Sequence, residues 1–213
     1  MFSLSIVAIV LAYTWLIAPI APHSAVAVPA LLVIGLAVSR ALKTSEWGVD
    51  GGAFVPALWR AALLTMGGVA VMYGASRRLG TWNHLDNGWA QLAVLVPWGL
   101  GQQFALHTVF LREAQRTVPR TAGLTLDRTR SPAAGVKPRL VAAVAFAALH
   151  LPNPFLTVAT FVGALGWCWI YDRYPNVLPL ALSHAVLTLA ILYAFDDRIT
   201  GGLRVGAAYL ARR

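Results

Sequence analysis

Polar side chains that could do acid–base chemistry stand at a few positions inside otherwise apolar stretches. Gln102, Gln103 and His107 lie in one such stretch, His150 ends another, and His184 lies in a third. An imidazole accepts or donates a proton near neutral pH, and an amide orients a water or a carbonyl through hydrogen bonds. Such groups are costly in apolar surroundings unless they meet one another. We therefore expect one shared interior site, the alternative being interhelical hydrogen bonds with no further role.

The spacing of these residues favours convergence. On a helix, residues four apart lie on one face, and three pairs have that spacing: Gln103 with His107, Phe146 with His150, and His184 with Thr188. Each of three helices would then present two side chains to the same interior.

The elements that must position these residues are membrane helices. Of 213 residues, 12% are charged and 58% are hydrophobic, where soluble domains average about 25% charged, and the mean hydropathy is +0.66. These values exclude a soluble domain and a disordered tail, and a single cysteine, Cys168, excludes a disulfide scaffold. The fold class expected is an all-α, polytopic transmembrane bundle. The net charge of +9 is expected to meet the lipid bilayer rather than nucleic acid.

Seven segments are apolar enough to be membrane helices, in one domain that covers 1–213. We expect the first to be a retained helix rather than a signal peptide, because it lacks a basic n-region. Turn residues separate the segments. Their expected ranges are 3–21, 24–39, 54–75, 89–111, 139–151, 155–171 and 176–195.

The loop 112–139 is the one long polar stretch, and it is strongly basic. The positive-inside rule predicts that it is cytoplasmic. Alternation of the segments then places 40–52 and Asp172-Arg173 on the same side.

All eight carboxylates lie in loops or at segment ends: Glu46, Asp50, Asp86, Glu113, Asp127, Asp172, Asp196 and Asp197. Coupled transporters usually carry an acid near the membrane midplane, so this distribution disfavours a small transporter, which remains an alternative together with a membrane scaffold. Arg60 lies inside an apolar segment and is expected to snorkel to the interface, the alternative being that it reaches the interior site. We interpret Trp167 and Trp169 as packing against lipid or neighbouring helices.

Three motifs in order resemble those of the CPBP family (CAAX protease and bacteriocin-processing, or Abi), which are intramembrane proteases. The family's Glu-Glu-x-x-x-Arg is represented by Gln-Gln-Phe-Ala-Leu-His at 102–107. Its Phe-x-x-x-His is matched by 146–150, followed by Leu-Pro-Asn, and its His-x-x-x-Asn/Asp by 184–188. The resemblance covers a core of 89–195, and 161–166 is similar to the family's glycine-bearing helix.

By this resemblance the catalytic positions are Gln102, Gln103, His150 and His184, and His107, Phe146 and Thr188 line the substrate site. The family's glutamate and histidine activate a water that attacks a peptide carbonyl. Here both glutamates are glutamine, which has no useful basicity, and the family's arginine is His107.

Several interpretations therefore stay open. The leading one is an intramembrane endopeptidase in a bacterial cytoplasmic (inner) membrane, acting on a membrane-associated peptide or protein, with His150 and His184 orienting water and stabilising the oxyanion. The second is an inactive relative that binds such a peptide as a chaperone, immunity factor or scaffold. Glu113 could replace the motif acid in another register. No cofactor is expected, with one alternative: zinc held by His107, His150 and His184, a ligand set that leaves an open position for water.

Overall fold

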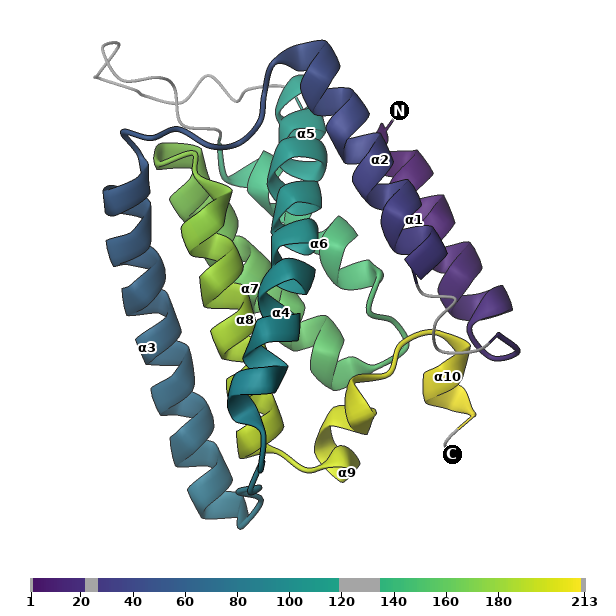
Figure 1. Cartoon of the computed structure of the whole chain (residues 1–213), viewed down its shortest axis with the longest axis vertical. Helices are drawn as coiled ribbons and strands as arrows, with labels where there is room; N and C mark the ends of the chain where they lie inside the picture. The colour runs from purple at the N-terminus through teal and green to yellow at the C-terminus, as the bar shows by residue number, and fades with distance from the viewer. Residues whose placement is uncertain (1, 22–26, 119–134, 212–213) are drawn as a thin grey trace.

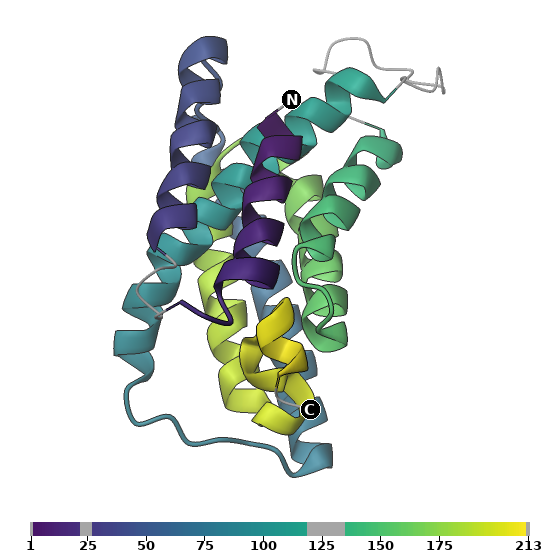
Figure 2. The same cartoon turned by 90° about the vertical axis from the view of Figure 1, so that its right-hand side faces the viewer.

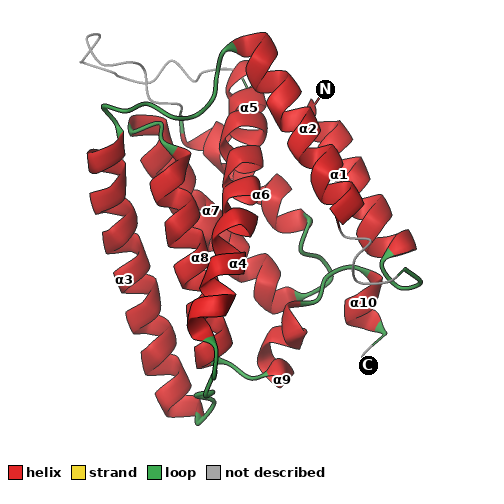
Figure 3. Cartoon of the chain, in the orientation of Figure 1, coloured by secondary structure: helices red, strands yellow, loops and turns green. Residues whose placement is uncertain are grey.

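The computed structural model describes residues 2–21, 27–118 and 135–211, and within them the chain is helical with a single isolated β-bridge, Val49 to Asn176 (Figures 1 and 3). The helices are α1 (Phe2–Ala12), α2 (Ala27–Thr44), α3 (Phe54–Leu79), α4 (Gly88–Phe104), α5 (Arg112–Thr117), α6 (Val136–Ala148), α7 (Pro154–Arg173), α8 (Val177–Ala194), α9 (Asp197–Thr200) and α10 (Ala207–Leu210), with π-helical segments Tyr13–Ile17 and Ala105–Leu111 and a 3-10 turn Gly201–Leu203.

The predicted all-α class is confirmed, and the apolar segments coincide with helices. In the described part of the chain, three helices are long and apolar enough to cross a membrane: α3, α7 and α8. The count of seven membrane segments stays a prediction. Both ends of the predicted loop 112–139 are helical: α4, the π-helical segment and α5 run continuously to Thr117, and α6 begins at Val136. Most of the remaining basic loop lies outside the described residues.

The long helices form a bundle in which α8 is central. It packs against α4 on one side and α3 on the other, while α6 packs on α7 (Figure 1). Glycine allows the closest of these approaches, since a Cβ at Gly99 of α4 would lie 3.0 Å from the carbonyl oxygen of Ala181 in α8. In the view turned by 90°, α1 lies in front and the short C-terminal helices lie below it (Figure 2).

One end of the bundle gathers the three segments predicted to share a side. Asp50 N–H donates to Pro175 C=O at 3.0 Å, and Val177 N–H donates to Gly48 C=O at 2.9 Å. Gly48 has φ +71°, and a Cβ there would lie 2.8 Å from the Thr108 side chain, so glycine fits both the backbone and the space. These bonds tie the α2–α3 connection to the α7–α8 turn.

The charged pairs of the same end join α5, α6 and α7. Arg139 donates to Asp172 at 2.8 Å, and Gln115 donates to the same carboxylate at 3.1 Å. Arg40 and Arg116 both contact Glu46, at 2.7 and 3.4 Å. The predicted grouping of 40–52, the start of 112–139 and Asp172-Arg173 at one end is thus observed.

The opposite side of the core is closed by Asn153, which is fully buried. Its Oδ1 accepts from Leu156 N–H at 3.0 Å and so caps α7, whose first residue is Pro154. Its Nδ2 donates to the carbonyls of Thr200 and Arg204 at 2.8 and 2.9 Å. One side chain therefore both starts α7 and holds the C-terminal turns against the α6–α7 connection.

Candidate active site

A glutamine bridges two histidines in the middle of the bundle. Gln103 Oε1 is 2.7 Å from His107 Nε2, and Gln103 Nε2 is 3.0 Å from His184 Nδ1. Gln103 and His107 are fully buried and His184 is 7% exposed. The helical spacing brings the first two together, and the close approach at Gly99 brings α8, with His184, against α4. The predicted convergence of these three residues is what the structure has.

Helix α7 supplies two aromatic planes that hold the bridged imidazoles. Trp167 stacks on His184 with centroids 4.8 Å apart and 7° between planes, and Tyr171 stacks on His107 at 4.5 Å and 11°. Gly163, one turn before Trp167, leaves room for the indole, since a Cβ there would lie 3.0 Å from it. Each ring of the bridge is therefore fixed by a hydrogen bond at its edge and an aromatic ring on its face.

This role of Trp167 and Tyr171 was not predicted from the sequence. Both residues are buried, and Trp167 packs against a neighbouring helix, as expected, but on a histidine of the candidate site. The available signal was their i, i+4 spacing on the glycine-bearing helix, which puts Gly163, Trp167 and Tyr171 on one face.

Phe146 and His150 come from the end of α6 and meet as their spacing predicted. Their rings lie 5.2 Å apart, and the Phe146 ring is also 6.5 Å from that of His184 at 89°. His150 Nδ1 is 3.0 Å from the Phe146 carbonyl. A carbonyl only accepts, so Nδ1 carries the hydrogen and Nε2 of the neutral ring is left with its lone pair. His150 is partly exposed, whereas His107 and His184 are buried.

Gln102 and Thr188 stand beside this cluster rather than in its hydrogen-bond network. Gln102 Oε1 is buried and has no hydrogen-bond partner in the described part of the chain. Thr188 lies one turn beyond His184 on α8 and is partly buried, with no hydrogen bond to any described residue. Both residues keep polar atoms free for something other than the fold.

The described carboxylates whose partners the structure shows bond to residues outside the histidine cluster. Glu113 accepts from the backbone N–H groups of Phe2 and Ser3 at 3.0 and 3.1 Å, at the start of α1. These hydrogen bonds hold Glu113 at the start of α1 and not at the histidine cluster. The position of Glu113 therefore does not support the alternative in which it replaces the motif acid. Arg60 donates to Pro56 C=O and lies 4.1 Å from the Tyr174 ring, as expected for a side chain that turns to the end of the bundle.

No group of three or more His, Cys, Asp or Glu side chains within the described residues is arranged to hold a metal ion. Of the zinc alternative's three histidines, His107 and His184 are joined through the Gln103 amide rather than facing a common point. The cluster as it stands offers hydrogen-bonding groups, among them the lone pair of His150 Nε2.

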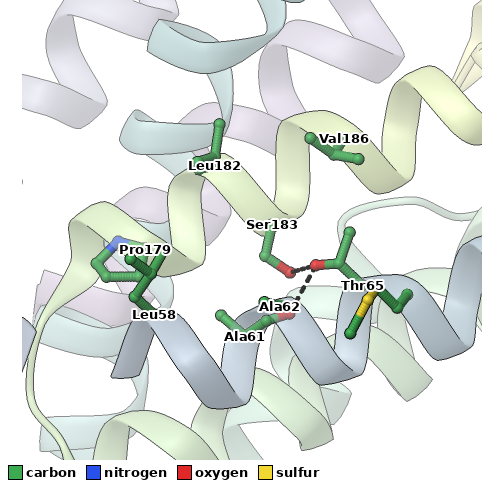
Figure 4. A pocket seen from close by; sticks show the side chains of 9 residues that line it. Leu58, Ala61, Ala62, Thr65, Pro179, Leu182, Ser183 and Val186 are labelled. Atoms are coloured by element: carbon green, nitrogen blue, oxygen red, sulfur yellow. Dashed lines mark hydrogen bonds between the residues drawn. The ribbon is translucent and has the colours of Figure 1, made fainter. Parts of the chain in front are cut away.

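A groove of about 210 Å³ lies between α3 and α8 (Figure 4). Its lining is apolar except for Thr65 and Ser183, whose hydroxyls are 2.7 Å apart. Trp167 Nε1 donates to Ser183 Oγ at 3.0 Å. The indole thus contacts both a residue that lines the groove, Ser183, and the His184 imidazole on which it stacks.

Residues 104–190 match a known protein family. They match the model of the family described as type II CAAX prenyl endopeptidase, Rce1-like. This segment is similar to that family, in agreement with the resemblance of the three motifs. The match contains His107, Phe146, His150, His184 and Thr188 and begins directly after Gln103, where the sequence departs from the acidic motif. No curated protein and no solved structure gives a significant match.

The family match and the three apolar helices indicate an integral membrane protein. The matched segment lies within the predicted core of 89–195.

Proposed function

We propose that the protein is a membrane endopeptidase that cleaves a membrane-associated peptide or protein, with His150 as the general base. The observation that carries this proposal is the bond from His150 Nδ1 to the Phe146 carbonyl. It fixes the ring orientation and leaves Nε2 with a lone pair, in a residue that is partly exposed. A positioned imidazole is the side chain most often used to take a proton from water.

The other site residues take supporting roles in this proposal. His184 stabilises the oxyanion of the tetrahedral intermediate, and Gln102 orients the water or the scissile amide through its unpartnered Oε1. Phe146 and Thr188 line the substrate position beside the two histidines. Because His150 supplies the base, the mechanism needs neither a carboxylate nor a metal.

The substrate class follows from the surroundings of the site. His150 lies at the end of α6 in a bundle with membrane-capable helices, so a peptide must reach it from within or beside the bilayer. We propose a membrane-inserted or lipid-modified protein, or a peptide such as a bacteriocin precursor. The proposed location is a bacterial cytoplasmic membrane.

The test compares protein termini in cells that carry the wild type with cells that carry His150→Ala. His84→Ala is the matched control, because His84 is exposed in the loop before α4. New peptide ends should appear with the wild type and the control and be absent with His150→Ala, at equal membrane levels of all three proteins. Removal of a general base typically lowers a rate by about 10²–10⁴-fold. Identical termini in all three strains would overturn the proposal.

The same cleavage assay tests the zinc alternative. We expect activity to survive a chelator and purified protein to contain no stoichiometric zinc. Cleavage that is lost on chelation and restored by zinc would assign the water activation to a metal instead.

A second candidate, binding without hydrolysis, is favoured by one observation. Gln102, at the position of the family's catalytic glutamate, has a buried and unpartnered oxygen that suits a peptide N–H, and an amide has no basicity. A photocrosslinker at position 188, beside the site on α8, should then capture a peptide partner equally well with His150 in place and in His150→Ala. A partner captured without any cleavage would support binding alone, and Gln102→Leu, which lacks the accepting oxygen, should weaken that capture.

A further inference from the structure

The Gln103 side chain has a fixed polarity, and it touches one nitrogen of each of two histidines. A primary amide donates from its nitrogen and accepts at its oxygen, and it cannot exchange these roles. Gln103 Oε1 lies 2.7 Å from His107 Nε2, and its Nε2 lies 3.0 Å from His184 Nδ1. One histidine must therefore donate to the bridge while the other accepts from it.

The surroundings of His107 show which histidine donates to Gln103 and which accepts from it. His107 Nδ1 is buried and has no partner in the described part of the chain, and stacking on Tyr171 holds the ring in place. With the amide reversed, the proton of a neutral His107 would sit on Nδ1 as a buried N–H without an acceptor. Buried unpaired N–H groups are rarer and more costly than an acceptor with an unused lone pair. His107 therefore donates from Nε2 to Gln103 Oε1.

The rest of the chain of bonds follows from this end. The Gln103 N–H donates to His184 Nδ1, which must be a bare lone pair, so the single proton of a neutral His184 sits on Nε2. His150 has the opposite tautomer, because its Nδ1–H donates to the Phe146 carbonyl. The Nε2 atoms of His184 and His150 therefore differ: that of His184 is an N–H donor and that of His150 is an acceptor.

We infer that Gln103 is a positioning residue that sets His184 as the Nε2–H tautomer and so makes it the oxyanion donor that complements His150 as base. The catalytic half of this inference rests on the function proposed above, whereas the tautomer does not. His150 Nε2 takes a proton from water while the water oxygen bonds to the scissile carbonyl carbon. The carbonyl oxygen, now negative, accepts the His184 Nε2–H. The C–N bond then breaks, and the proton on His150 passes to the leaving amine.

A carboxylate at position 103 would reverse His184. Both oxygens of a glutamate only accept, so in Gln103→Glu the His184 proton moves to Nδ1 and its Nε2 loses the hydrogen that faces the oxyanion. His107 keeps its donor role toward either side chain. Glutamine and glutamate have nearly the same shape. Glutamine in place of the motif glutamate at this position therefore changes mainly which nitrogen of His184 carries the proton.

The experiment is two-bond ¹H–¹⁵N correlation of the full-length protein, labelled with ¹⁵N-histidine and purified in micelles, which distinguishes Nδ1–H from Nε2–H rings. His184 signals are assigned by their loss in His184→Ala. The wild type should show His184 and His107 as Nε2–H and His150 as Nδ1–H. Gln103→Glu should convert His184 alone to Nδ1–H, and Gln91→Glu, on the same helix α4 and without a side-chain bond, should change none of them.

The assigned wild-type spectrum tests the inference without Gln103→Glu, so the inference can be refuted even if the Gln103→Glu protein fails to fold. An Nδ1–H His184 in the wild type would overturn it, and so would an unchanged His184 in a folded Gln103→Glu. Where cleavage is measurable, Gln103→Glu should lower kcat by about 10²–10³-fold, the loss typical of one oxyanion donor, with KM nearly unchanged. If the protein cleaves nothing, the spectrum still tests the tautomer and only the proposed function fails.

Discussion

Replacement of the buried Asn153 by alanine should destabilise the protein more than replacement of an exposed polar residue in a loop. The side chain is fully buried and makes three hydrogen bonds: to Leu156 N–H, to Thr200 C=O and to Arg204 C=O. Loss of the helix cap costs about 1 kcal/mol, and each carbonyl left without its donor costs about 1–2 kcal/mol. The expected loss is about 3–5 kcal/mol of unfolding free energy.

The assay exploits Cys168, which is the single cysteine and is fully buried. A thiol-reactive fluorophore reports its exposure as purified protein is heated in detergent. At about 2–4 °C per kcal/mol for a chain of this size, Asn153→Ala should lower the midpoint by on the order of 10 °C. Asn153→Ser, which keeps only the cap, should fall in between.

The matched control is Asn87→Ala, since Asn87 precedes α4 at the equivalent position but its side chain makes no capping bond. Its midpoint should stay within about 2 °C of the wild type, as for most exposed surface substitutions. An Asn153→Ala midpoint equal to that of the control would refute the reasoning that the three bonds hold this side of the core.

Three further changes are expected to have measurable effects. Arg139→Ala leaves the nearly buried Asp172 carboxylate without its 2.8 Å partner and should cost about 3 kcal/mol in the same thermal assay, with Arg139→Lys recovering part of it. Gly99→Leu should force α4 from α8, because a Cβ already meets the Ala181 carbonyl at 3.0 Å, and should reduce both stability and peptide capture. At Glu113, burial alone would raise the pKa, but hydrogen bonds from Ser3 outweigh it and hold the pKa below the usual range. The Glu113 carboxylate therefore stabilises the fold above the ordinary pKa of a glutamate and stops doing so as pH falls through its depressed value. A stability–pH profile of Glu113→Gln should accordingly differ from that of the wild type at neutral pH and converge with it in acid; parallel profiles would contradict this account.

Local periodicity predicted the parts of the site that lie on one helix. The pairs Gln103–His107 and Phe146–His150 meet because residues four apart share a helix face, and the observed contacts of 2.7 Å and 5.2 Å agree with this. The connections between α6 and α7 and between α7 and α8 also lie at Pro and Asn residues, where turns were predicted. The continuation to Thr117 was not predicted, because tertiary contacts such as that of Gln115 with Asp172 support a polar helical turn that composition alone disfavours.

The rotation of α7 against its neighbours could not be predicted from the sequence pattern. Stacking of Trp167 on His184, and of Tyr171 on His107, depends on how α7 is rotated against α4 and α8. An apolar all-round helix such as α7 gives no periodic signal of its rotation. The engagement of Glu113 with the start of α1 likewise joins residues more than a hundred apart, and no local pattern announces it.

The Gln103 bridge between His107 and His184 has an electrical consequence. Gln103 can donate to His184 Nδ1 only when that imidazole is neutral, so the bridged trio carries no formal charge. A transmembrane voltage changes the energy of a charged group by about 2.3 kcal/mol per elementary charge per 100 mV. The trio has no formal charge, so the voltage does not change its energy in this way. The geometry of the trio should therefore be the same in energised and de-energised membranes, unlike that of a site built from carboxylates and a guanidinium.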